Sequence, residues 1–540
     1  MYRHEDNLFF KGFGECIAWE GNSLGQDLLN NNIHGEYFYS LLYNNKKSYP
    51  IYYKYKNNTI TNKKIPSLRL NIARFYAGGS TRSTITYNGQ ILQEQYPPDA
   101  GRRQFGFWNY WTDNDTNWDW KADEGQVAIL KKAKELGAQY FELSSNSPLW
   151  FFTKSKSVQG VNKALKVYLL DSCPNDPELC NLQYWNIGDH AFYLTKVALY
   201  AKTEWGINFY SIAPYNEPTG FATSFEYCSG WSSITSSNQE GCMYDMNTRK
   251  QLIQSLHTLI KNNTEHSHPI LLSVDDENQY FYAIKSMEYY KDNNVYDIID
   301  KINVHGYIYG KNDASNTDMI DLRNKNIYKE IWQSEISSEH VEFYFWSTQI
   351  MMTLIDLKPQ AYILWTLFDS SPWGWTSGDN FDNSTNNNNI YYYVPDKYWA
   401  VLHFSRFLLP GMNIRVAKTC GTVIDKYTGK NIDICDYYGS ERYNKTSYYL
   451  QSDNNEGVIS VIYINISDHD SSYTIPFTSF SDGKIYAIKT SFNETDIIGT
   501  PYEPINNNII LSNTLQCPPM TIISVMFVPN HLDQNTYIPF

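Results

Sequence analysis

The chain has no excess of basic residues. Its 540 residues include 44 Lys and Arg against 57 Asp and Glu, which gives a net charge of −13. An acidic chain without a basic stripe binds nucleic acid poorly, so we expect no nucleic-acid partner. It also lacks an apolar run of the roughly 18 residues that a membrane span needs, which predicts no membrane-spanning segment.

The start of the chain lacks the features of a signal peptide. It reads Met1-Tyr-Arg-His-Glu-Asp6, without an apolar stretch or a small-residue cleavage site. Three interpretations stay open at this point. The chain is given without its leader, or the gene model starts late, or the protein is cytosolic.

The eight cysteines lack the spacing of zinc ligands, and we expect neither a metal nor a cofactor. Six of them fall in close pairs along the chain, Cys173 with Cys180, Cys228 with Cys242, and Cys420 with Cys435. Local pairs of this kind are typical of disulfides that staple loops in an oxidising compartment. Cys16 and Cys517 are left over, and buried free thiols are favoured for both without their pairing being decided.

Asn-x-Ser/Thr sequons point to the same compartment as the paired cysteines. Seven occur in the chain, at Asn57, Asn114, Asn262, Asn383, Asn444, Asn465 and Asn493. Some are expected by chance in a chain so rich in Asn. Together the sequons and the cysteine pairs predict a secreted, extracellular glycoprotein with disulfides.

Short apolar runs alternate with helical periodicity along the first part of the chain. The expected strands cover residues 12–18, 68–75, 140–144, 209–215, 270–274, 302–305, 330–334 and 361–367. Between them lie stretches such as residues 123–136, where Val127, Leu130 and Ala133 recur at helical spacing before Gly137. Eight such units predict an α/β fold, a (β/α)8 TIM barrel.

The pattern changes after the expected closing helix, which ends at Pro410-Gly411. Strand-like runs such as residues 457–464 and 520–527 are separated there by Asn, Asp, Gly and Ser clusters. We therefore expect a C-terminal antiparallel β-sandwich. The predicted domains are the barrel, residues 1–409, and the sandwich, residues 410–540, with the first residues of the chain contacting the sandwich.

Two glutamates, each at the end of an expected barrel strand, carry the functional prediction. Glu217 ends the run Ser211-Ile-Ala-Pro-Tyr-Asn-Glu-Pro218, and Glu335 ends Ile331-Trp-Gln-Ser-Glu335. The C-terminal ends of barrel strands are where such barrels keep their chemistry. Glycoside hydrolysis needs two carboxylates so placed, one to protonate the leaving oxygen and one to attack or to activate water.

A carboxylate nucleophile must stay ionised, so Glu335 needs hydrogen-bond donors close to it. Arg74 and Tyr307, which lie at or just past strand ends, are the expected donors. Asn216, beside Glu217, is placed to hydrogen-bond a sugar hydroxyl.

Other polar and aromatic side chains at strand ends are expected to shape the pocket. They are Trp19, Asn146, Trp150, His305 and Trp365. A lone His without clustered carboxylates or cysteines is weak evidence for a metal, so we reject a metal site at His305.

Several segments of the chain, in this order and spacing, resemble glycoside hydrolase family 30 and within it the endo-β-1,6-galactanase-like branch. The matching segments are Gly12-Phe-Gly with Ala18-Trp19, Asn71-Ile-Ala-Arg74, Trp118-Asp-Trp-Lys-Ala-Asp123, Ser145-Asn-Ser-Pro148 with Trp150, Pro214-Tyr-Asn-Glu-Pro218, Gln239-Glu-Gly-Cys242, Asn303-Val-His-Gly-Tyr307 and Trp332-Gln-Ser-Glu335. The Ser-Asn-Ser-Pro and Gln-Glu-Gly-Cys segments favour this branch over the glucosylceramidase-like one.

The resemblance implies a retaining enzyme with a (β/α)8 barrel and an attached β-sandwich. It implies that Glu217 is the acid/base and Glu335 the nucleophile. The family's subsite positions fall on Arg74, Asn146, Trp150, Asn216, His305, Tyr307 and Trp365. The chain departs from many members after Arg74, where it reads Phe-Tyr-Ala-Gly-Gly, and before Trp150, where a second Pro is absent.

We therefore expect a monomeric enzyme that cuts β-1,6-galactan chains and whose partner is a polysaccharide or oligosaccharide. A β-glucosidase, β-1,6-glucanase or β-xylanase of the same family is the alternative, and a pocket or an open cleft around Trp19, Trp118 and Trp150 would separate exo from endo action. A non-catalytic carbohydrate-binding protein on this scaffold is expected to lose one carboxylate, whereas this chain has both.

Overall fold

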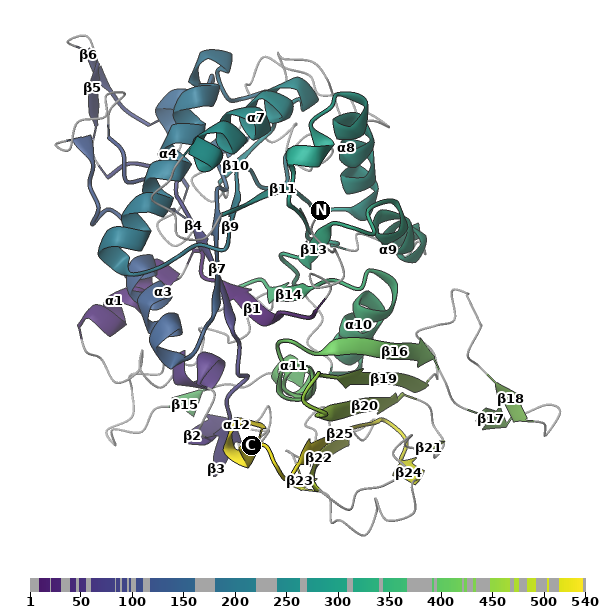
Figure 1. Cartoon of the computed structure of the whole chain (residues 1–540). Coiled ribbons are helices and arrows are strands. Elements are labelled where there is room, and N and C mark those ends of the chain that lie inside the picture. Colours follow the sequence, from purple (N-terminus) through teal and green to yellow (C-terminus); the bar gives the residue numbers. More distant parts are fainter. Residues whose placement is uncertain are drawn as a thin grey trace.

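The structure is a computed structural model, and the figures show its ribbon (Figure 1). It describes residues 9–19, 21–30, 39–44, 48–54, 60–82, 84–87, 90–94, 97–98, 103–109, 117–160, 180–219, 240–262, 270–307, 314–338, 343–366, 391–392, 396–419, 422–424, 431–433, 447–466, 471–474, 483–491, 503–504 and 514–537. Every structural statement below concerns these residues.

Eight parallel strands close into a barrel. In chain order they are β1 (Gly12–Cys16), β4 (Ile72–Tyr76), β7 (Tyr140–Ser144), β9 (Ser211–Ala213), β11 (Leu271–Glu277), β12 (Lys301–Val304), β13 (Glu330–Gln333) and β14 (Ala361–Leu364). Neighbours in this order pair with one another, and β1 closes the ring by pairing with β14. The predicted (β/α)8 barrel is confirmed, with a strand at each of the eight expected places.

The barrel strands are buried on both faces, which is why the sequence shows them as apolar runs. All residues of β1 and β4 are buried. One face of each strand packs against the helices and the other fills the barrel interior. Arg74 is the exception in β4, because a full positive charge lies inside the barrel and must be paired there.

Helices cover the outside of the barrel (Figure 1). They are α1 (Gly21–Leu29), α3 (Glu124–Leu136), α4 (Ile187–Tyr200), α7 (Met246–Asn262), α8 (Tyr280–Asp292), α9 (Ala314–Lys325), α10 (Phe343–Asp356) and α11 (Asp396–Phe407). The helix α3 shows how the sequence sets their ends. It stops at Gly137, whose φ of 119° suits glycine, and the Gly137 and Ala138 amides bond back to the last turn.

Smaller sheets flank the barrel on its loops. They pair β2 (Ser48–Lys54), β3 (Ile60–Pro66) and β15 (Tyr391–Tyr392), then β5 (Ile85–Tyr87) with β6 (Gln90–Leu92), and β8 (Gln159–Gly160) with β10 (Gly241–Cys242). The β8–β10 pair is parallel, with Gly241 opposite Gln159 and Cys242 opposite Gly160.

The C-terminal part of the chain folds as an antiparallel sheet of six strands. Their order is β16 (Asn413–Thr419), β19 (Ser447–Asp453), β20 (Ile459–Asn465), β25 (Thr521–Pro529), β22 (Gly483–Ser491) and β23 (Glu503–Pro504). Shorter pairs join β17 (Thr422–Ile424) to β18 (Asn431–Asp433) and β21 (Ser471–Thr474) to β24 (Thr514–Cys517), and α12 (Gln534–Tyr537) follows. This second antiparallel sheet is consistent with the expected sandwich.

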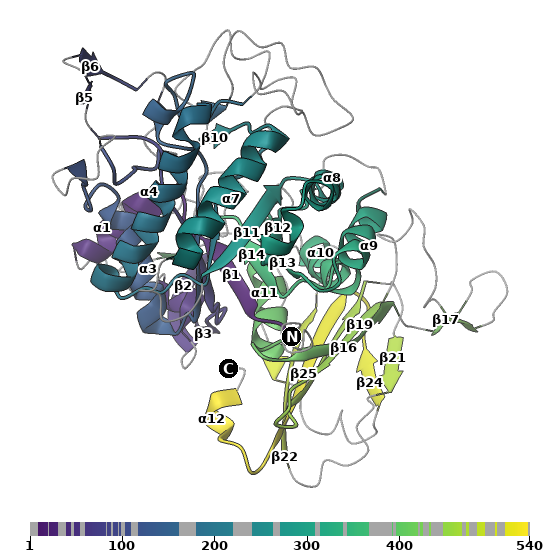
Figure 2. The ribbon, with the colours of Figure 1, turned by 45° about the horizontal axis from the view of Figure 1, so that its top comes forward.

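The sheet packs against the barrel through two helices, α10 and α11, which lie between them (Figure 2). Fully buried His403 in α11 is hydrogen-bonded at Nδ1 to Ser524 and at Nε2 to Thr490, both at 2.8 Å. The chain start also reaches this junction, since the Phe10 amide donates to the Met412 carbonyl at 3.0 Å. The boundary at residues 409 and 410 stays a prediction, and it falls between α11 and β16.

The expected secretion stays a prediction, and only some of the residues on which it rests are described. Cys180 and Cys242 are free thiols in the structure, while Cys173, Cys228, Cys420 and Cys435 lie outside the described residues, so the local disulfides stay predictions. The sequon at Asn465 is fully buried and its Nδ2 donates to the Cys517 carbonyl at 2.9 Å, which leaves no room for a glycan in the folded chain. Among the described helices, none has the length and apolarity of a membrane span.

Candidate active site

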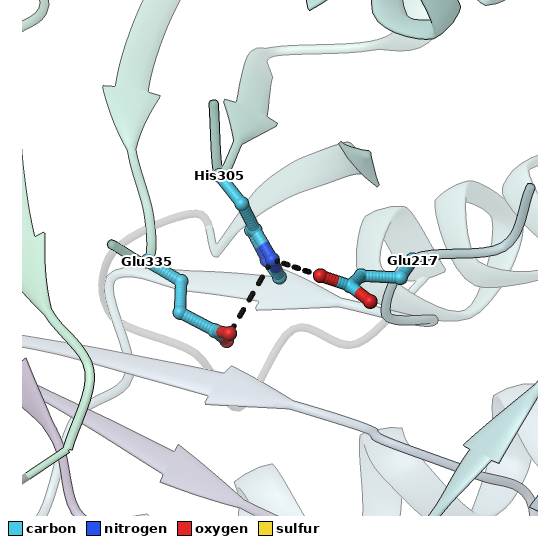
Figure 3. Close-up of side chains that lie close together, drawn as sticks. All are labelled: Glu217, His305 and Glu335. Carbon is cyan, nitrogen blue, oxygen red and sulfur yellow. Dashed lines mark hydrogen bonds and ion pairs between the residues drawn. The ribbon is translucent and has the colours of Figure 1, made fainter. Parts of the chain in front are cut away.

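The two glutamates singled out by the sequence meet above the C-terminal end of the barrel. Glu217 follows β9 and Glu335 follows β13, and both side chains point toward His305 (Figure 3). An oxygen of each carboxylate and a nitrogen of His305 all lie within 4.8 Å of one another. Strands far apart in the sequence therefore place two carboxylates close enough to share one small substrate group.

His305 stands between the two carboxylates. It follows β12, and its Nδ1 is 3.0 Å from Glu217 Oε1 and 3.4 Å from Glu335 Oε1. On its other side, Nε2 lies 3.4 Å from Asp276 Oδ1. Gly306 makes room for this arrangement, because a Cβ there would lie 2.1 Å from the Tyr280 hydroxyl.

The charges around His305 favour its protonated form. Burial alone would lower the pKa of this imidazole, but the neighbouring Glu335, Asp276 and Glu217 carboxylates raise the pKa of His305 to about 10. His305 and the two glutamates offer potential ligand atoms within 4.8 Å of one another, and a protonated imidazole uses its N–H groups to donate to carboxylates. The arrangement fits a proton and charge network.

Glu335 is held by three donors. Arg74 Nη1 lies 3.1 Å and the Tyr76 hydroxyl 3.0 Å from Oε2, and the Tyr307 hydroxyl donates to Oε1 at 2.8 Å. Burial raises the pKa of Glu335 above its usual value, and the charges of His305 and Arg74 oppose this rise. The donors also fix both oxygens in space, so the carboxylate presents one orientation to a substrate.

Glu217 has a different environment. Its side chain is 13% exposed against 6% for Glu335, and its one hydrogen-bond partner among the described residues is His305. A carboxyl group in this position can exchange a proton with solvent more readily than one enclosed by three donors. The two glutamates are therefore chemically unequal.

A layer of paired charges lies under the site, inside the barrel. Asp276 Oδ2 is 2.7 Å from Arg74 Nη2, and Asp276 Oδ1 accepts from Ser334 Oγ at 2.6 Å. Burial would raise the pKa of Asp276, yet Arg74 and His305 hold it lowered, at about 2. Asp276 is thus an anion that contacts both Arg74 and His305, the residues that touch the two glutamates.

Glu142 supports the same layer from β7. Its Oε1 is 3.1 Å from Arg74 Nε and accepts from Asn303 Nδ2 at 2.8 Å, and its Oε2 pairs with Lys301. All these side chains are buried, so the cost of taking each charge from water is offset by these partners and by Ser211 Oγ, which donates to Glu142 Oε2 at 2.6 Å. The network holds Arg74 in one geometry.

The backbone is strained at the site. Glu217 and Asp276 have backbone φ angles of 41° and 39°, values that residues other than glycine rarely adopt. The Glu217 amide donates to the Asp276 carbonyl at 2.9 Å, so the two strained residues hold each other. Such strain is typical of functional sites, where the surrounding structure imposes it.

The remaining predicted residues differ in their placement. Trp19 and Trp365 form an edge-to-face pair with ring centroids 4.8 Å apart, and Trp365 packs against Tyr76 in turn. Asn146 donates from Nδ2 to Gln104 at 3.1 Å. The Oδ1 atoms of Asn146 and Asn216 have no hydrogen-bond partner among the described residues. Each is therefore able to accept a hydrogen bond from a substrate hydroxyl.

Trp150 is not brought to the glutamates by any described contact. It lies in the short 3₁₀ turn Trp150–Phe152, its ring is 1% exposed, and its Nε1 donates to Thr81 at 2.9 Å. Trp118 is also buried, because its indole is stacked parallel to Trp108. These two rings are part of the packed interior in this structure.

The sequence missed Tyr76 and Asp276, which both have direct roles in the geometry. Tyr76 is two residues after Arg74 on β4, so the period of a strand puts both on the same face. Asp276 lies in the acidic run Asp275-Asp276-Glu277 at the end of β11, beyond the expected end of that strand. Both signals were present in the sequence.

The chain is similar to known glycoside hydrolases. The model of O-glycosyl hydrolase family 30 matches residues 37–320. An endo-β-1,6-galactanase of Hypocrea rufa is 27% identical over 418 residues, which cover 77% of this chain and 75% of that protein.

Two solved structures share the fold at low identity. A conserved exported protein from Bacteroides fragilis has a TM-score of 0.66 at 16% identity, with 96% of this chain and 97% of that chain covered. The catalytic domain of a family 30 xylanase C from Talaromyces cellulolyticus has a TM-score of 0.59 at 14% identity, with the same coverage of 96% and 97%.

Proposed function

The chain belongs to glycoside hydrolase family 30, and from that premise we propose that it hydrolyses β-1,6-galactan chains with retention of configuration. Glu335 is the nucleophile and Glu217 the acid/base. The observation that carries the proposal is the pair of carboxylates with oxygens within 4.8 Å. Retaining enzymes keep their carboxyl groups about 5–5.5 Å apart, whereas inverting ones need about 6.5–9.5 Å to hold a water between them.

In the first step, the Glu335 carboxylate attacks the anomeric carbon while Glu217 gives its proton to the departing glycosidic oxygen. Arg74 and Tyr307 favour the ionised form of Glu335, and together with Tyr76 they orient it through the hydrogen bonds described above. The negative charge of Glu335 is lost as the covalent bond forms. Tyr307 and Arg74 remain in place, so they stabilise the carboxylate again when that bond breaks.

In the second step, Glu217 takes a proton from water, and the water attacks the anomeric carbon and releases Glu335. This cycle requires Glu217 to change its protonation twice in each turnover. Its greater exposure supports that role, and so does the absence of the three donors that enclose Glu335. His305 Nδ1, at 3.0 Å from Glu217 Oε1, holds this carboxyl group in place beside Glu335.

The substrate class rests on the relative from Hypocrea rufa, which is named as an endo-β-1,6-galactanase. Asn146 and Asn216, with acceptor atoms that lack partners among the described residues, are proposed to bind the sugar hydroxyls beside the scissile bond. A β-glucosidase, β-1,6-glucanase or β-xylanase activity on the same two glutamates is the alternative.

A panel of defined oligosaccharides tests the proposal. We expect hydrolysis of β-1,6-linked galactooligosaccharides and little or none of β-1,6-glucan and β-1,4-xylan fragments, with the β-anomer of the new reducing end appearing first in proton NMR. An α-anomer appearing first would exclude retention. Cleavage confined to the gluco or xylo substrates would keep the two-glutamate chemistry and replace the galactan assignment.

Asp276→Asn tests the charged layer under the site. Asn keeps the size of the side chain but removes the anion that faces both Arg74 and His305. We expect kcat/KM to fall on the order of 10- to 100-fold, as for other groups that orient a reacting side chain from behind. Because Asp276 helps to raise the pKa of His305, the alkaline limb of the pH profile should move to lower pH.

The matched control is Asp300→Asn. Asp300 is an exposed carboxylate beside β11, and it accepts from the Leu272 amide at 2.8 Å at the opposite end of the barrel. The Asp300→Asn substitution should leave the pH profile of kcat/KM unchanged. If Asp276→Asn lowered the rate without moving the alkaline limb, Asp276 would be a structural residue only, and NMR titration of His305 would show an unaltered pKa.

A further inference from the structure

Two buried cysteines that lie far apart in the sequence, both free thiols in the structure, lie on neighbouring hydrogen-bonded segments beside the active site. Cys242 ends β10, and Cys180 lies on the segment that leads into α4. The two segments are hydrogen-bonded through the residues that follow each cysteine, since the Asn181 amide donates to the Met243 carbonyl at 3.1 Å. Both cysteines are buried, with exposed fractions of 1% and 0%.

The thiols share the same surroundings. Cys180 Sγ is 3.5 Å from the Leu182 carbonyl, and the Leu182 backbone also contacts the Cys242 thiol. Cys180 is close enough to Cys242 for its charge to raise the pKa of that thiol. Disulfides need Cα atoms about 4.4–6.8 Å apart, and hydrogen-bonded extended backbones generally run about 4.7–4.9 Å apart.

We propose that Cys180 and Cys242 form a disulfide in the mature enzyme, in place of the local pairs Cys173–Cys180 and Cys228–Cys242. The two S–H bonds break and one S–S bond forms. Two protons and two electrons pass to a disulfide oxidant such as oxidised glutathione, which becomes two thiols. The bond would close a loop that contains the whole segment around Glu217.

The bond must form while the chain folds. Burial raises the pKa of the Cys180 thiol to about 11, and it raises that of Cys242 as well. Thiolates are the reactive species, so the folded protein offers few of them and little access to an oxidant. The same burial would protect a disulfide, once formed, from reductants in the folded enzyme.

The position of this bond relates it to catalysis. Tyr244, two residues after Cys242, donates its amide to the Pro218 carbonyl at 3.2 Å, directly after Glu217. Thr219 then bonds to Glu277 Oε1 at 2.7 Å, and Glu277 pairs with Arg249 of α7. A bond at Cys242 therefore restrains the backbone that leads out of the acid/base glutamate.

Peptide mapping of the full chain, secreted from a eukaryotic host, tests the proposal. The sample is alkylated in denaturant without reductant, then digested and analysed by mass spectrometry. We expect one linked pair of peptides that carries Cys180 and Cys242. Links of Cys180 to Cys173 or of Cys242 to Cys228 would overturn the proposal, and so would alkylation of both cysteines. Reductant should break the link only when denaturant is present.

Four serine variants give a second measurement. Cys180→Ser and Cys242→Ser should each lower Tm by several degrees, and the double variant should lower it no further, because the same bond is lost once. Cys173→Ser and Cys228→Ser are matched controls that should keep both Tm and the linked peptide. If Cys173→Ser behaved as Cys180→Ser does, the local pairing would be correct and the proposal wrong.

Discussion

Glu335→Gln is expected to reduce kcat on every β-galactoside by about 10⁴-fold or more, because the amide cannot form the covalent intermediate. The substitution is isosteric, and Arg74, Tyr76 and Tyr307 still enclose the side chain. Substrate binding should therefore survive. A loss of kcat with a nearly unchanged Kd, measured by calorimetry on a non-hydrolysed oligosaccharide, is the result that separates chemistry from folding.

The control for this variant is Glu330→Gln, on the same strand β13. Glu330 lies at the other end of the barrel, where it accepts from the Tyr210 hydroxyl at 2.7 Å. The Glu330→Gln substitution should therefore change Tm and leave kcat nearly as it is in the wild type. Trapping with a fluorinated activated glycoside should label wild-type Glu335 and fail in Glu335→Gln, and label found on Glu217 instead would reverse the assigned roles.

The barrel could be predicted from the sequence because its strands are buried on both faces. Runs such as Ile72-Ala-Arg-Phe-Tyr76 and Ala361-Tyr-Ile-Leu364 are apolar almost throughout, and each ends at a change to polar residues. The two glutamates follow from the same logic, since a carboxylate directly after a buried run has little reason to be there except chemistry. Each of these signals lies within one short segment of the sequence, so it can be recognised without knowing which residues pack against that segment.

The charged layer under the site could not be predicted in the same way. Asp276 belongs to β11, whose last residues Asp275-Asp276-Glu277 have low strand propensity, so the strand was expected to end at Val274. A register shift between Asp275 and Glu277 lets the strand continue. Asp276 and Glu277 are stabilised there by pairing with Arg74 and Arg249, which come from other elements, and that pairing is a property of the tertiary structure.

Whether an aromatic ring points into the site also depends on the tertiary structure. Trp150 was expected to line the pocket, and the structure buries it against Thr81. Trp19, expected on the same grounds, packs edge to face on Trp365 next to the Tyr76 that bonds Glu335. Both tryptophans follow a predicted strand, and spacing alone does not say which of them points into the site.

Glu217→Gln is expected to give a different result from Glu335→Gln, and the difference defines the mechanism. Glutamine cannot donate a proton to the leaving oxygen or take one from water, so both steps slow, by about 10²- to 10⁴-fold on a natural galactan. An aryl β-galactoside with a very good leaving group needs no proton. The variant should therefore form the glycosyl-enzyme quickly on that substrate, release one equivalent of the phenol as a burst, and then stall.

Azide should restart the stalled enzyme, because a small anion attacks without a general base. Attack on the intermediate at Glu335 comes from the face that water normally uses, so Glu217→Gln should yield the β-galactosyl azide. Azide added to Glu335→Ala enters from the vacated nucleophile face and should yield the α-azide. NMR of the two products distinguishes them, and exchanged anomers would mean that Glu217 is the nucleophile. The burial contrast between the two side chains, 13% against 6%, favours the first outcome, since azide and water must both reach Glu217 while Glu335 stays enclosed by its donors.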